Sequence, residues 1–364
     1  MILNTSFWSG RRVLITGHTG FKGSWLTLWL SQLGAEVWGY SLLPDDDTSL
    51  FYGLSLCKVI NDVRHQYADI RDLQVLQQFV SQAQPQIVFH LAAQPLVRKS
   101  YTDPLGTWST NVQGSLNLME ALKSLSHDCS VVMVTTDKVY ANNEWDYGYR
   151  EEDRLGGLDP YSASKAAAEL AISSWRQSFC GDGAHQTPYI LIATARAGNV
   201  IGGGDWSRDR IVPDLIRSLK AGLSLPVRNP EATRPWQHVL EPLSGYLLLA
   251  ESLATKGDEF CTAFNFGPTL DSNKSVKALI NAALDYWPGT WHCPKTVAGP
   301  HEAGRLHLQT DKAYHQLGWK PLWPFSTTVE RTISWYKAVC SGNSVLDCCL
   351  CDIELYQKEL FNVS

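Results

Sequence analysis

A tyrosine and a lysine four residues apart form the pair whose types and spacing most directly suggest chemistry. Tyr161 and Lys165 lie in the segment PYSASKAAAEL. Four residues are about one helical turn, so both side chains project from one face of a helix. A nearby ammonium lowers the pKa of a phenol from its usual ~10, which makes the phenolate accessible near neutral pH. We therefore expect Tyr161 to take a proton from a substrate hydroxyl.

A glycine-rich segment near the N-terminus has the spacing of a dinucleotide-binding loop. The sequence GHTGFKG, residues 17–23, lies between a predicted strand and a predicted helix. Its three glycines permit a tight turn, a close approach of the backbone to a pyrophosphate, and close packing of helix on strand. The N–H groups that open the helix attract the anion. The expected cofactor-binding residues are Gly17, Gly20, Phe21, Gly23, Asp69, Ile70, Tyr161 and Lys165.

Two further polar groups follow predicted strands. Asp69 comes after a presumed third strand, where its carboxylate could meet an adenine amine; alternatively it caps a helix that begins at Leu73. The run TTDK, residues 135–138, ends a short apolar segment and contributes Thr136, Asp137 and Lys138. Together with the glycine loop, this run makes a chance occurrence of the Tyr/Lys pair a poor explanation.

The first half of the chain alternates short apolar runs with longer periodic segments, which is typical of a parallel sheet with crossover helices. We predict a helix over residues 21–33, and helix starts at Asp103-Pro104 and Asp159-Pro160, where a capping carboxylate precedes proline. From about Ile201, glycine, tryptophan and proline become frequent, which indicates a second, loop-rich lobe. The predicted strands are residues 13–15, 36–41, 87–91 and 131–135.

Length and composition bound the function. The 364 residues suggest about two domains, and 44% hydrophobic with 18% charged residues is ordinary globular composition. The formal charge of -5 and the lack of a long basic run argue against a nucleic-acid partner. No stretch has signal-peptide or membrane-span character, so we expect a cytoplasmic protein with no membrane partner.

The nine cysteines show no paired CxxC spacing, which favours reduced thiols. The cluster Cys348, Cys349 and Cys351 has no second group of ligands nearby, so we assign no metal.

The second lobe offers weaker candidates for ligand contacts. Residues 208–234 contain six basic and three acidic side chains, a local balance of +3. Such a balance describes either a solvated face or a wall that binds pyrophosphate through arginine forks. Asn199 and Arg234 are our candidates for substrate contacts, followed by Arg210 and His238, although each could instead satisfy buried backbone groups.

These motifs together carry a family resemblance. The glycine loop, the segment HLAAQP at residues 90–95, the strand-end TTDK and the helix YSASK resemble the extended short-chain dehydrogenase/reductase superfamily. Within it, the stretches FWSGRRVLITGHTGFKGSWL, LDPYSASKAAAEL, ARAGNVIGGGDWSRDRIVPD and RPWQHVLEPLSGYLLLAE resemble the CDP-glucose 4,6-dehydratases. The related dTDP-glucose enzymes have Asp followed by Glu at the strand end, whereas this chain has Asp137 followed by Lys138.

The resemblance implies an α/β fold, a Rossmann-like doubly wound parallel sheet with a smaller C-terminal substrate-binding lobe. It implies an NAD-binding domain over residues 1–197, joined by residues 236–268, and a lobe over residues 198–364 that mainly binds a nucleotide sugar. The expected partners are that small-molecule substrate and further copies of the chain in a homo-oligomer.

The resemblance also implies roles for individual residues. Thr136 would hydrogen-bond O4 of the sugar, Lys165 would hold the nicotinamide ribose, and Asp137 would protonate the departing C6 hydroxyl. Asn111 would help to position the catalytic centre. Lys138 has two open roles, as the base at C5 or as a cation that stabilises the enolate, and a neighbouring carboxylate favours the charged form. The late segment HEAGRLHLQTDKA has Gln309 where relatives often carry aspartate, and we assign no site there.

Two other classes of function stay open. A nucleotide-sugar 4-epimerase needs Tyr161 and Lys165 but has no use for an acid at C6, so the Asp137-Lys138 pair argues against it. A non-catalytic NAD-binding sensor typically lacks the Tyr/Lys pair. The end of the second strand, Gly39 to Leu42, has neither the usual acid that holds the ribose of NAD nor a basic residue for NADP. The choice of NAD over NADP therefore depends on the resemblance and on the lack of a basic residue at this position.

Overall fold

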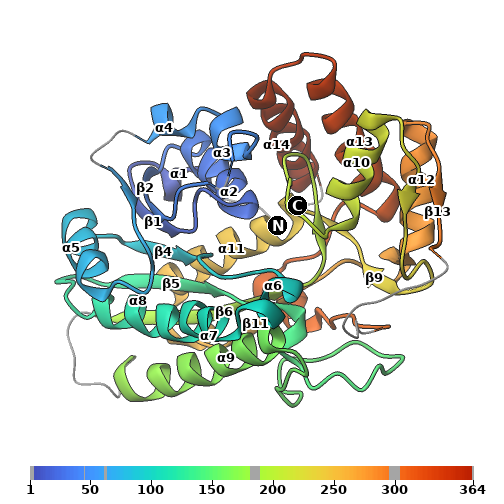
Figure 1. Ribbon diagram of the computed structural model, residues 1–364. Helices are drawn as coiled ribbons and strands as arrows, with labels where there is room; N and C mark the ends of the chain where they lie inside the picture. The colour runs from blue at the N-terminus through green and yellow to red at the C-terminus, as the bar shows by residue number, and fades with distance from the viewer. Residues whose placement is uncertain (1–3, 45, 61–63, 181–188, 295–303, 363–364) are drawn as a thin grey trace.

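A seven-stranded sheet organises the protein (Figure 1). The computed structural model describes residues 4–44, 46–60, 64–180, 189–294 and 304–362. The strands run in the order β11-β6-β5-β4-β1-β2-β3, and every neighbouring pair is parallel. This arrangement confirms the predicted doubly wound α/β fold. The strands are β1 (Arg12–Thr16), β2 (Glu36–Ser41), β3 (His65–Tyr67), β4 (Ile87–His90), β5 (Cys129–Val134), β6 (Ile190–Ala197) and β11 (Ala263–Phe266).

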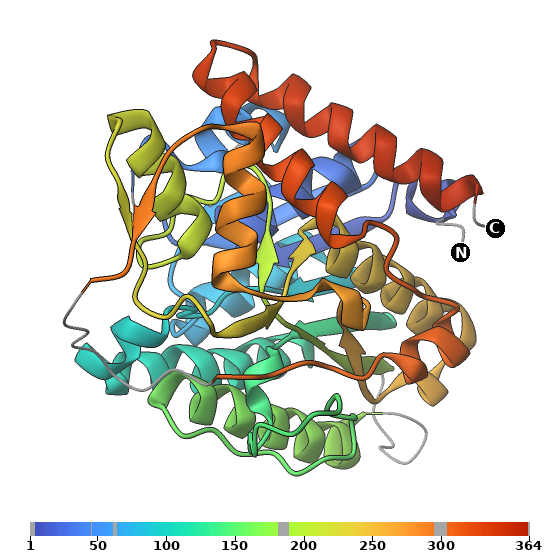
Figure 2. The same ribbon diagram turned by 90° about the vertical axis from the view of Figure 1, so that its right-hand side faces the viewer.

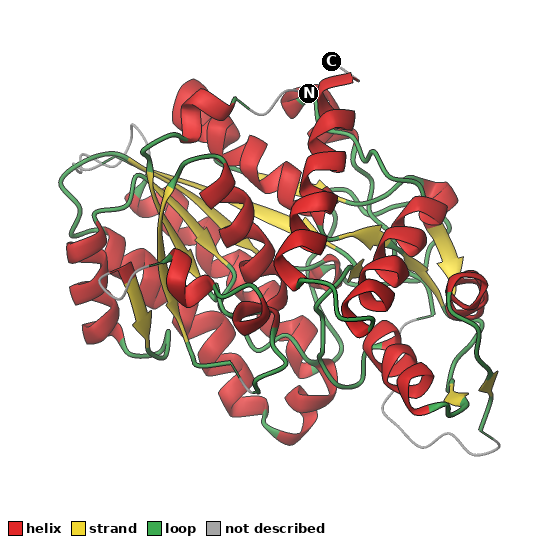
Figure 3. Cartoon of the chain, turned by 90° about the horizontal axis from the view of Figure 1, so that it is seen from above, coloured by secondary structure: helices red, strands yellow, loops and turns green. Residues whose placement is uncertain are grey.

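Helices cover both faces of the sheet, which is why its central strands β4, β5 and β6 are buried along their whole length. One core contains side chains of α2 (Phe21–Gln32) and α11 (Leu240–Lys256). The other contains side chains of α5 (Leu73–Ala83), α8 (Gly114–Leu122) and α9 (Pro160–Phe179). Figure 3 shows these helices in red on the two sides of the strands. The carboxyl ends of the strands, where ligands of open α/β sheets bind, are left to the loops.

The second lobe is built mainly from helices and two-stranded pairs beside the sheet (Figure 2). Its helices are α10 (Ile211–Ala221), α12 (Val276–Tyr286) and α13 (Phe325–Cys340). The pairs are β7 (Val200–Ile201) with β10 (Gln237–His238), β9 (Thr233–Pro235) with β12 (Asn273–Ser275), and β8 (Leu225–Pro226) with β13 (Trp291–His292).

Short helices complete the described chain. They are α1 (Thr5–Trp8), α3 (Leu50–Gly53), α4 (Leu56–Val59), α6 (Val97–Thr102), α7 (Pro104–Trp108), the π-helix η2 (Ser109–Gln113), η3 (Asp137–Val139), η4 (Asp258–Phe260), η5 (Leu270–Ser272) and the π-helix η6 (Ala313–Leu317).

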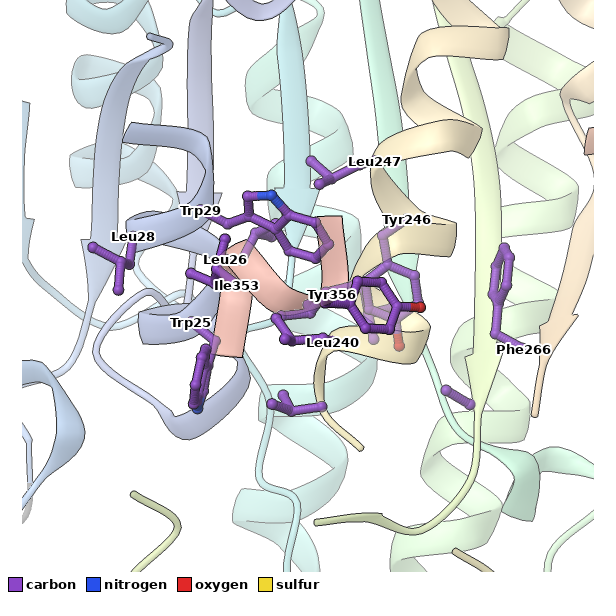
Figure 4. Close-up of a cluster of buried hydrophobic side chains, with 14 of the residues drawn as sticks. Trp25, Leu26, Leu28, Trp29, Leu240, Tyr246, Leu247, Phe266, Ile353 and Tyr356 are labelled. Atoms are coloured by element: carbon purple, nitrogen blue, oxygen red, sulfur yellow. The ribbon is translucent and has the colours of Figure 1, made fainter. Parts of the chain in front are cut away.

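The C-terminal helix α14 (Val345–Asn362) packs back against the first half of the chain. In Figure 4, Tyr356 and Ile353 of α14 lie among Trp25 and Trp29 of α2. The Tyr356 hydroxyl donates to Glu241 of α11 at 2.7 Å, inside this apolar cluster. Residues 345–362 therefore belong to the core beneath the sheet as much as to the second lobe.

The two predicted helix starts at Asp103-Pro104 and Asp159-Pro160 are confirmed, whereas the helix at Leu73 is not capped by Asp69. Asp103 accepts from the backbone N–H of Gly106, and Asp159 accepts from that of Ser162, each ahead of a proline. The helix at Leu73 is capped by Asp72, so Asp69 is left for another role. No helix within the described residues is long and apolar enough to cross a membrane.

Candidate active site

Tyr161 and Lys165 lie in the first turns of α9, beside the end of β5. The cap formed by Asp159 fixes where α9 begins and so where both side chains point. Tyr161 is 8% exposed and Lys165 is 6% exposed. The Lys165 ammonium donates to the carbonyl of Val134 at 3.2 Å, which ties α9 to the last residue of β5. The pair is thus held at the carboxyl edge of the sheet.

The acidity of Tyr161 differs from the sequence prediction. Burial raises the pKa of Tyr161 to about 12, although hydrogen bonding from Thr136 and the charge of Arg210 act in the opposite direction. Burial also lowers the pKa of Lys165 to about 8, opposed by Glu169. The expected lowering of the phenol pKa by Lys165 is therefore wrong for the protein without ligand, because desolvation of the phenolate outweighs the nearby charges.

The strand-end residues Thr136, Asp137 and Lys138 meet Tyr161 at this edge. The Thr136 hydroxyl donates to Asp137 Oδ1 at 3.0 Å. Lys138 Nζ lies 3.5 Å from Asp137 Oδ1, and the Lys138 side chain is 30% exposed while that of Asp137 is 2% exposed. Asp137 is thus a buried carboxylate whose ammonium partner stays in contact with solvent.

Two of the second-lobe candidates join this group. Lys138 Nζ donates to Asn199 Oδ1 at 3.5 Å. Arg210 is paired with Asp205 at 2.9 Å, and its charge acts on Tyr161. Within the +3 segment Arg217 pairs with Asp214, whereas Asp205, the partner of Arg210, lies just before the segment. Arg210 is therefore the member of this segment that the fold directs toward the catalytic residues.

The other candidates lie elsewhere. Arg234, on β9, donates to the carbonyls of Thr233 at 2.8 Å and Gly304 at 3.3 Å. His238 is fully buried, with its ring 4.7 Å from that of Trp323, and the structure does not bring it to the catalytic residues.

Asn111 is buried in the π-helix η2. Its side-chain amide donates to Ser164 of α9 at 2.9 Å and accepts from the backbone of Gln94 at 2.9 Å. These bonds join the loop after β4 to the helix that carries Tyr161, so Asn111 supports the catalytic helix.

The glycine loop fits a pyrophosphate. Gly17 has φ +77°, and a Cβ there would lie 2.7 Å from the backbone nitrogen of Ala92. A Cβ on Gly23 would lie 2.1 Å from the carbonyl oxygen of Gly17. Gly20 is exposed at the start of α2, whose first turn has no side-chain cap. The N–H groups of that turn are thus free of a competing carboxylate or hydroxyl.

The adenosine end of the loop contains polar groups without the usual ribose acid. Thr19 Oγ1 and Ser41 Oγ are 2.7 Å apart at the end of β2. The Asp69 carboxylate is bound by Arg71 at 2.6 Å, and Arg71 holds the pKa of Asp69 below its usual range. Asn117 donates to the carbonyl of Ile70 at 3.1 Å and so fixes the turn that follows β3.

Lys22, within the glycine loop, is a residue that sequence reasoning missed. Its Nζ donates to the Tyr246 hydroxyl at 3.3 Å. Burial and the charge of Arg210 lower the pKa of Lys22 to about 7, and Asp137 acts in the opposite direction. A lysine inside the predicted pyrophosphate-binding loop was the available signal, but only the fold shows that it faces the same charges as Tyr161.

A second missed feature is a buried carboxylate one turn after Lys165. Glu169 accepts from Thr135 at 2.5 Å, from Thr194 at 2.9 Å, and from Nε and Nη2 of Arg196 at 3.0 Å each. Burial raises the pKa of Glu169, but Arg196 and the two hydroxyls together hold it below its usual range. Each of the two Glu169 carboxylate oxygens therefore accepts two hydrogen bonds. We call Glu169, Arg196, Thr135 and Thr194 the α9 brace.

A pocket of about 280 Å³ lies beside Pro235, the last residue of β9. A Cβ on Gly198 would lie 2.8 Å from Asp137 Oδ2 and 3.3 Å from Pro235, so the absent side chain leaves Asp137 open toward Pro235. The volume suits one part of a nucleotide sugar. The lining residues are Pro235, Pro268, Thr269, Leu270, Asn273, His307, Leu308, Gln309 and Thr310.

Comparisons with known proteins agree with this geometry. The family model for GDP-mannose 4,6-dehydratase matches residues 14–332. The chain is 44% identical to the CDP-glucose 4,6-dehydratase of Salmonella typhimurium over 98% of its own length and 99% of that protein. It is 25% identical to a UDP-glucose 4-epimerase of Halalkalibacterium halodurans, with coverage of 89% and 95%.

Among solved structures, a double mutant of the dTDP-glucose 4,6-dehydratase DesIV from Streptomyces venezuelae, with NAD bound, shares the fold. Its TM-score is 0.73 at 24% identity, with coverage of 90% of this chain and 97% of that one.

A glycine loop at the carboxyl edge of a parallel sheet and a Tyr/Lys pair on the adjoining helix define an enzyme of the extended short-chain dehydrogenase/reductase class. The chain belongs to the GDP-mannose 4,6-dehydratase family and is a homologue of a CDP-glucose 4,6-dehydratase. The resemblance inferred from the motifs is thereby confirmed.

Proposed function

We propose that this protein is an NAD-dependent hydro-lyase that converts CDP-glucose to CDP-4-dehydro-6-deoxyglucose. The observation that carries the proposal is the buried Asp137, placed beside Thr136 and Lys138 and on the same sheet edge as Tyr161. The 44% identity to a CDP-glucose 4,6-dehydratase over nearly the whole chain supports the nucleotide and the sugar.

NAD fits the residues that would hold it. The loop of Gly17, Gly20 and Gly23 would receive the pyrophosphate, and Asp69 with Ile70 would border the adenine. Lys165 would hold the nicotinamide ribose. When bound, the dinucleotide supplies a reversible acceptor for the hydride that leaves C4 and later enters C6. The described residues from Gly39 to Leu42 include no base for a 2′-phosphate, which favours NAD over NADP.

Tyr161 performs the first proton transfer in this proposal. Its phenolate takes the 4-hydroxyl proton as C4 becomes a ketone, and the Thr136 hydroxyl contacts O4. Because burial disfavours the phenolate, positive charge must compensate, and Arg210 already acts in that direction on the pKa of Tyr161. The oxidised nicotinamide adds a further positive charge when it binds.

Asp137 and Lys138 serve the elimination. The ketone at C4 acidifies C5–H, Lys138 takes that proton as the base, and the resulting enolate expels the C6 hydroxyl. Asp137 protonates the departing hydroxyl, and Lys138, which carries the C5 proton as an ammonium, faces the developing charge and returns that proton to C5 as the product forms.

The second lobe holds the nucleotide in this account. Asn199 beside Lys138 and Arg210 beside Tyr161 lie nearest to the sugar. Arg234 neighbours Pro235, which borders the 280 Å³ pocket, and both the arginine and the pocket would meet the diphosphate and nucleoside. A 4-epimerase would need Tyr161 and Lys165 only, so the poised acid favours dehydration.

Two properties of the whole molecule complete the proposal. The eight described cysteines are free thiols, as in proteins of the reducing cytoplasm. Large apolar side chains near α7 and α9 are solvent-exposed, including Leu105 at 83%, Leu158 at 93% and Leu170 at 61%, and they would be covered in a homo-oligomer. Light scattering on the purified protein would measure its mass in solution.

The activity is tested by incubating the purified protein and NAD with CDP-, dTDP-, UDP- and GDP-glucose separately. Mass spectrometry should show loss of one water from CDP-glucose with the highest kcat/KM. A product of unchanged mass would indicate an epimerase, and no product from any sugar would contradict the proposal. Equal activity with NADP alone would contradict the choice of cofactor.

A further inference from the structure

An aspartate of the second lobe contacts two arginines that come from distant parts of the chain. Arg98 lies on α6, which follows strand β4 of the sheet, and its Nη1 is 3.2 Å from Asp209 Oδ1. Arg228 lies between β8 and β9 of the second lobe, and its Nη2 is 3.9 Å from the same oxygen. One carboxylate oxygen therefore links two guanidiniums, one from the sheet side and one from the second lobe.

The backbone of Asp209 adopts a rare conformation. Its φ is +60°, in the left-handed region that residues other than glycine seldom occupy, although aspartate tolerates it better than most. The Asp209 side chain is 49% exposed, and exposed ion pairs add little to stability. Folding alone therefore explains this strained residue poorly, and such outliers gather where ligands bind.

The Arg98 guanidinium has an unused donor. Its Nε is buried and has no hydrogen-bond partner among the described residues, while its Nη1 donates to Asp209. A guanidinium binds a phosphate group through two parallel N–H groups, so a single carboxylate oxygen leaves this fork half used. Because buried donors are normally bonded, Arg98 is incompletely satisfied without a ligand.

The three side chains lie where the sheet edge meets the second lobe. Helix α6 packs against α9, the helix of the catalytic tyrosine. Asp209 immediately precedes Arg210, the N-cap residue of α10, which pairs with Asp205 at 2.9 Å. Arg210 thus has a carboxylate partner of its own, whereas Arg98 and Arg228 share one.

We propose that Arg98 and Arg228 bind the diphosphate of the nucleotide sugar, and that Asp209 holds both arginines in place until the substrate arrives. The diphosphate of a nucleotide sugar carries two negative charges, one for each guanidinium, whereas Asp209 supplies one. A phosphate oxygen takes the position of Asp209 Oδ1, and the exposed carboxylate turns to solvent. This inference rests on the proposed function and adds two residues, besides Arg234, to its diphosphate site.

Calorimetric titration of the NAD-loaded protein with CDP tests this site without turnover. Arg98→Gln should weaken CDP binding by about 10–100-fold, because a charge-assisted contact is lost. Asp209→Asn keeps a side chain that tolerates the left-handed backbone but removes the competing charge, so CDP should bind about 3-fold more tightly, the scale of an exposed ion pair. In a protein that already carries Arg98→Gln, the same change should tighten binding less, because the two residues act on one another.

Lys277→Gln is the matched control, because Lys277 pairs with Glu231 elsewhere on the second lobe and its loss changes the net charge equally. It should leave the CDP affinity unchanged. Titration of the NAD-free protein with NAD should give the wild-type Kd for Arg98→Gln. Weaker NAD binding with unchanged CDP binding would assign Arg98 to the cofactor and overturn the proposal.

Unchanged CDP affinity in both Arg98→Gln and Asp209→Asn would show that the contact is an ion pair between lobes only, and the proposal would be wrong. Failure of the proposed function would be distinct, since the variants would then alter CDP binding although the wild-type protein dehydrates no CDP-glucose. A wild-type protein that binds UDP, dTDP or GDP more tightly than CDP would correct the substrate, and the same variants would test the site with that nucleotide.

Discussion

Two buried carboxylates lie close to the same helix and differ in how fully their oxygens are occupied. Glu169 in the α9 brace receives four hydrogen bonds, two of them from one guanidinium. Asp137 receives one from Thr136 and has a half-buried ammonium 3.5 Å away. A saturated carboxylate fixes the structure, whereas an incompletely bonded one retains an oxygen that can exchange a proton with a ligand. Burial alone therefore does not distinguish a carboxylate that could act as an acid from one that stabilises the structure.

The largest expected effect on activity comes from removing Tyr161, the proposed base, rather than from changing either carboxylate. Tyr161→Phe should lower kcat by about 10²–10⁴-fold, the range for a lost general base, with NAD binding nearly unchanged. Steady-state kinetics with CDP-glucose and calorimetric titration of NAD measure the two effects. A variant that retains most of its rate would show that another group takes the 4-hydroxyl proton.

Removing charge from the α9 brace should affect folding more than chemistry. Glu169→Gln leaves the Arg196 guanidinium buried without a counter-charge, which costs about 3–5 kcal/mol of unfolding free energy. Denaturant unfolding of this variant and of Asp137→Asn compares the two carboxylates directly. Equal losses of unfolding free energy in Asp137→Asn and Glu169→Gln would contradict the different roles assigned to the two carboxylates.

A third buried carboxylate predicts a pH effect on stability. Burial raises the pKa of Glu241 to about 7, although N–H groups of Trp323 and Leu322 and the Tyr356 hydroxyl act in the opposite direction. Because the folded state binds this proton more tightly than the unfolded state, its contribution is present below the unfolded pKa and is lost as the pH rises through about 7. The loss amounts to about 3 kcal/mol at most.

Melting temperatures from pH 5 to pH 8 would check this sign. Wild-type stability should fall across that range more steeply than that of Glu241→Gln. Parallel slopes for the two proteins would mean that Glu241 ionises in the folded state as it does in the unfolded state.

The smallest effect concerns the second lobe. Arg234→Ala should raise KM for CDP-glucose by an amount equivalent to about 1.5–3 kcal/mol if a charge-assisted hydrogen bond to the diphosphate is lost, with kcat nearly constant. Arg234 also bonds the carbonyls of Thr233 and Gly304, so thermal denaturation must be measured alongside. An unchanged KM with lower stability would assign Arg234 to the loop structure only.

The sequence alone predicts the parallel sheet and two of the helix starts well, because local rules determine them. Strand periodicity, the glycine spacing and the Asp-Pro caps at residues 103 and 159 each depend on a few neighbouring residues. The charges around Lys22 could not be predicted in this way, since its partner Tyr246 is 224 residues away. His238 shows the same limit: its ring is enclosed by Trp25 and Trp323, which only the tertiary fold brings together.

The acidity of Tyr161 was mispredicted for a related reason. The i, i+4 spacing correctly places Lys165 on the same helix, but burial of the phenol, which raises its pKa to about 12, depends on the surrounding core. The lining of the second lobe is equally non-local, because β9 pairs with β12 across about 40 residues.

In the proposed reaction, Asp137 is the acid of the elimination and takes no part in the oxidation at C4. The measurement is stopped-flow absorbance of the NAD-loaded Asp137→Asn variant after mixing with CDP-glucose. We expect the absorbance of reduced nicotinamide to rise at nearly the wild-type rate and then to persist. Release of the dehydrated product should slow by about 10²–10⁴-fold. Turnover at the wild-type rate, or no absorbance change at all, would contradict this role of Asp137.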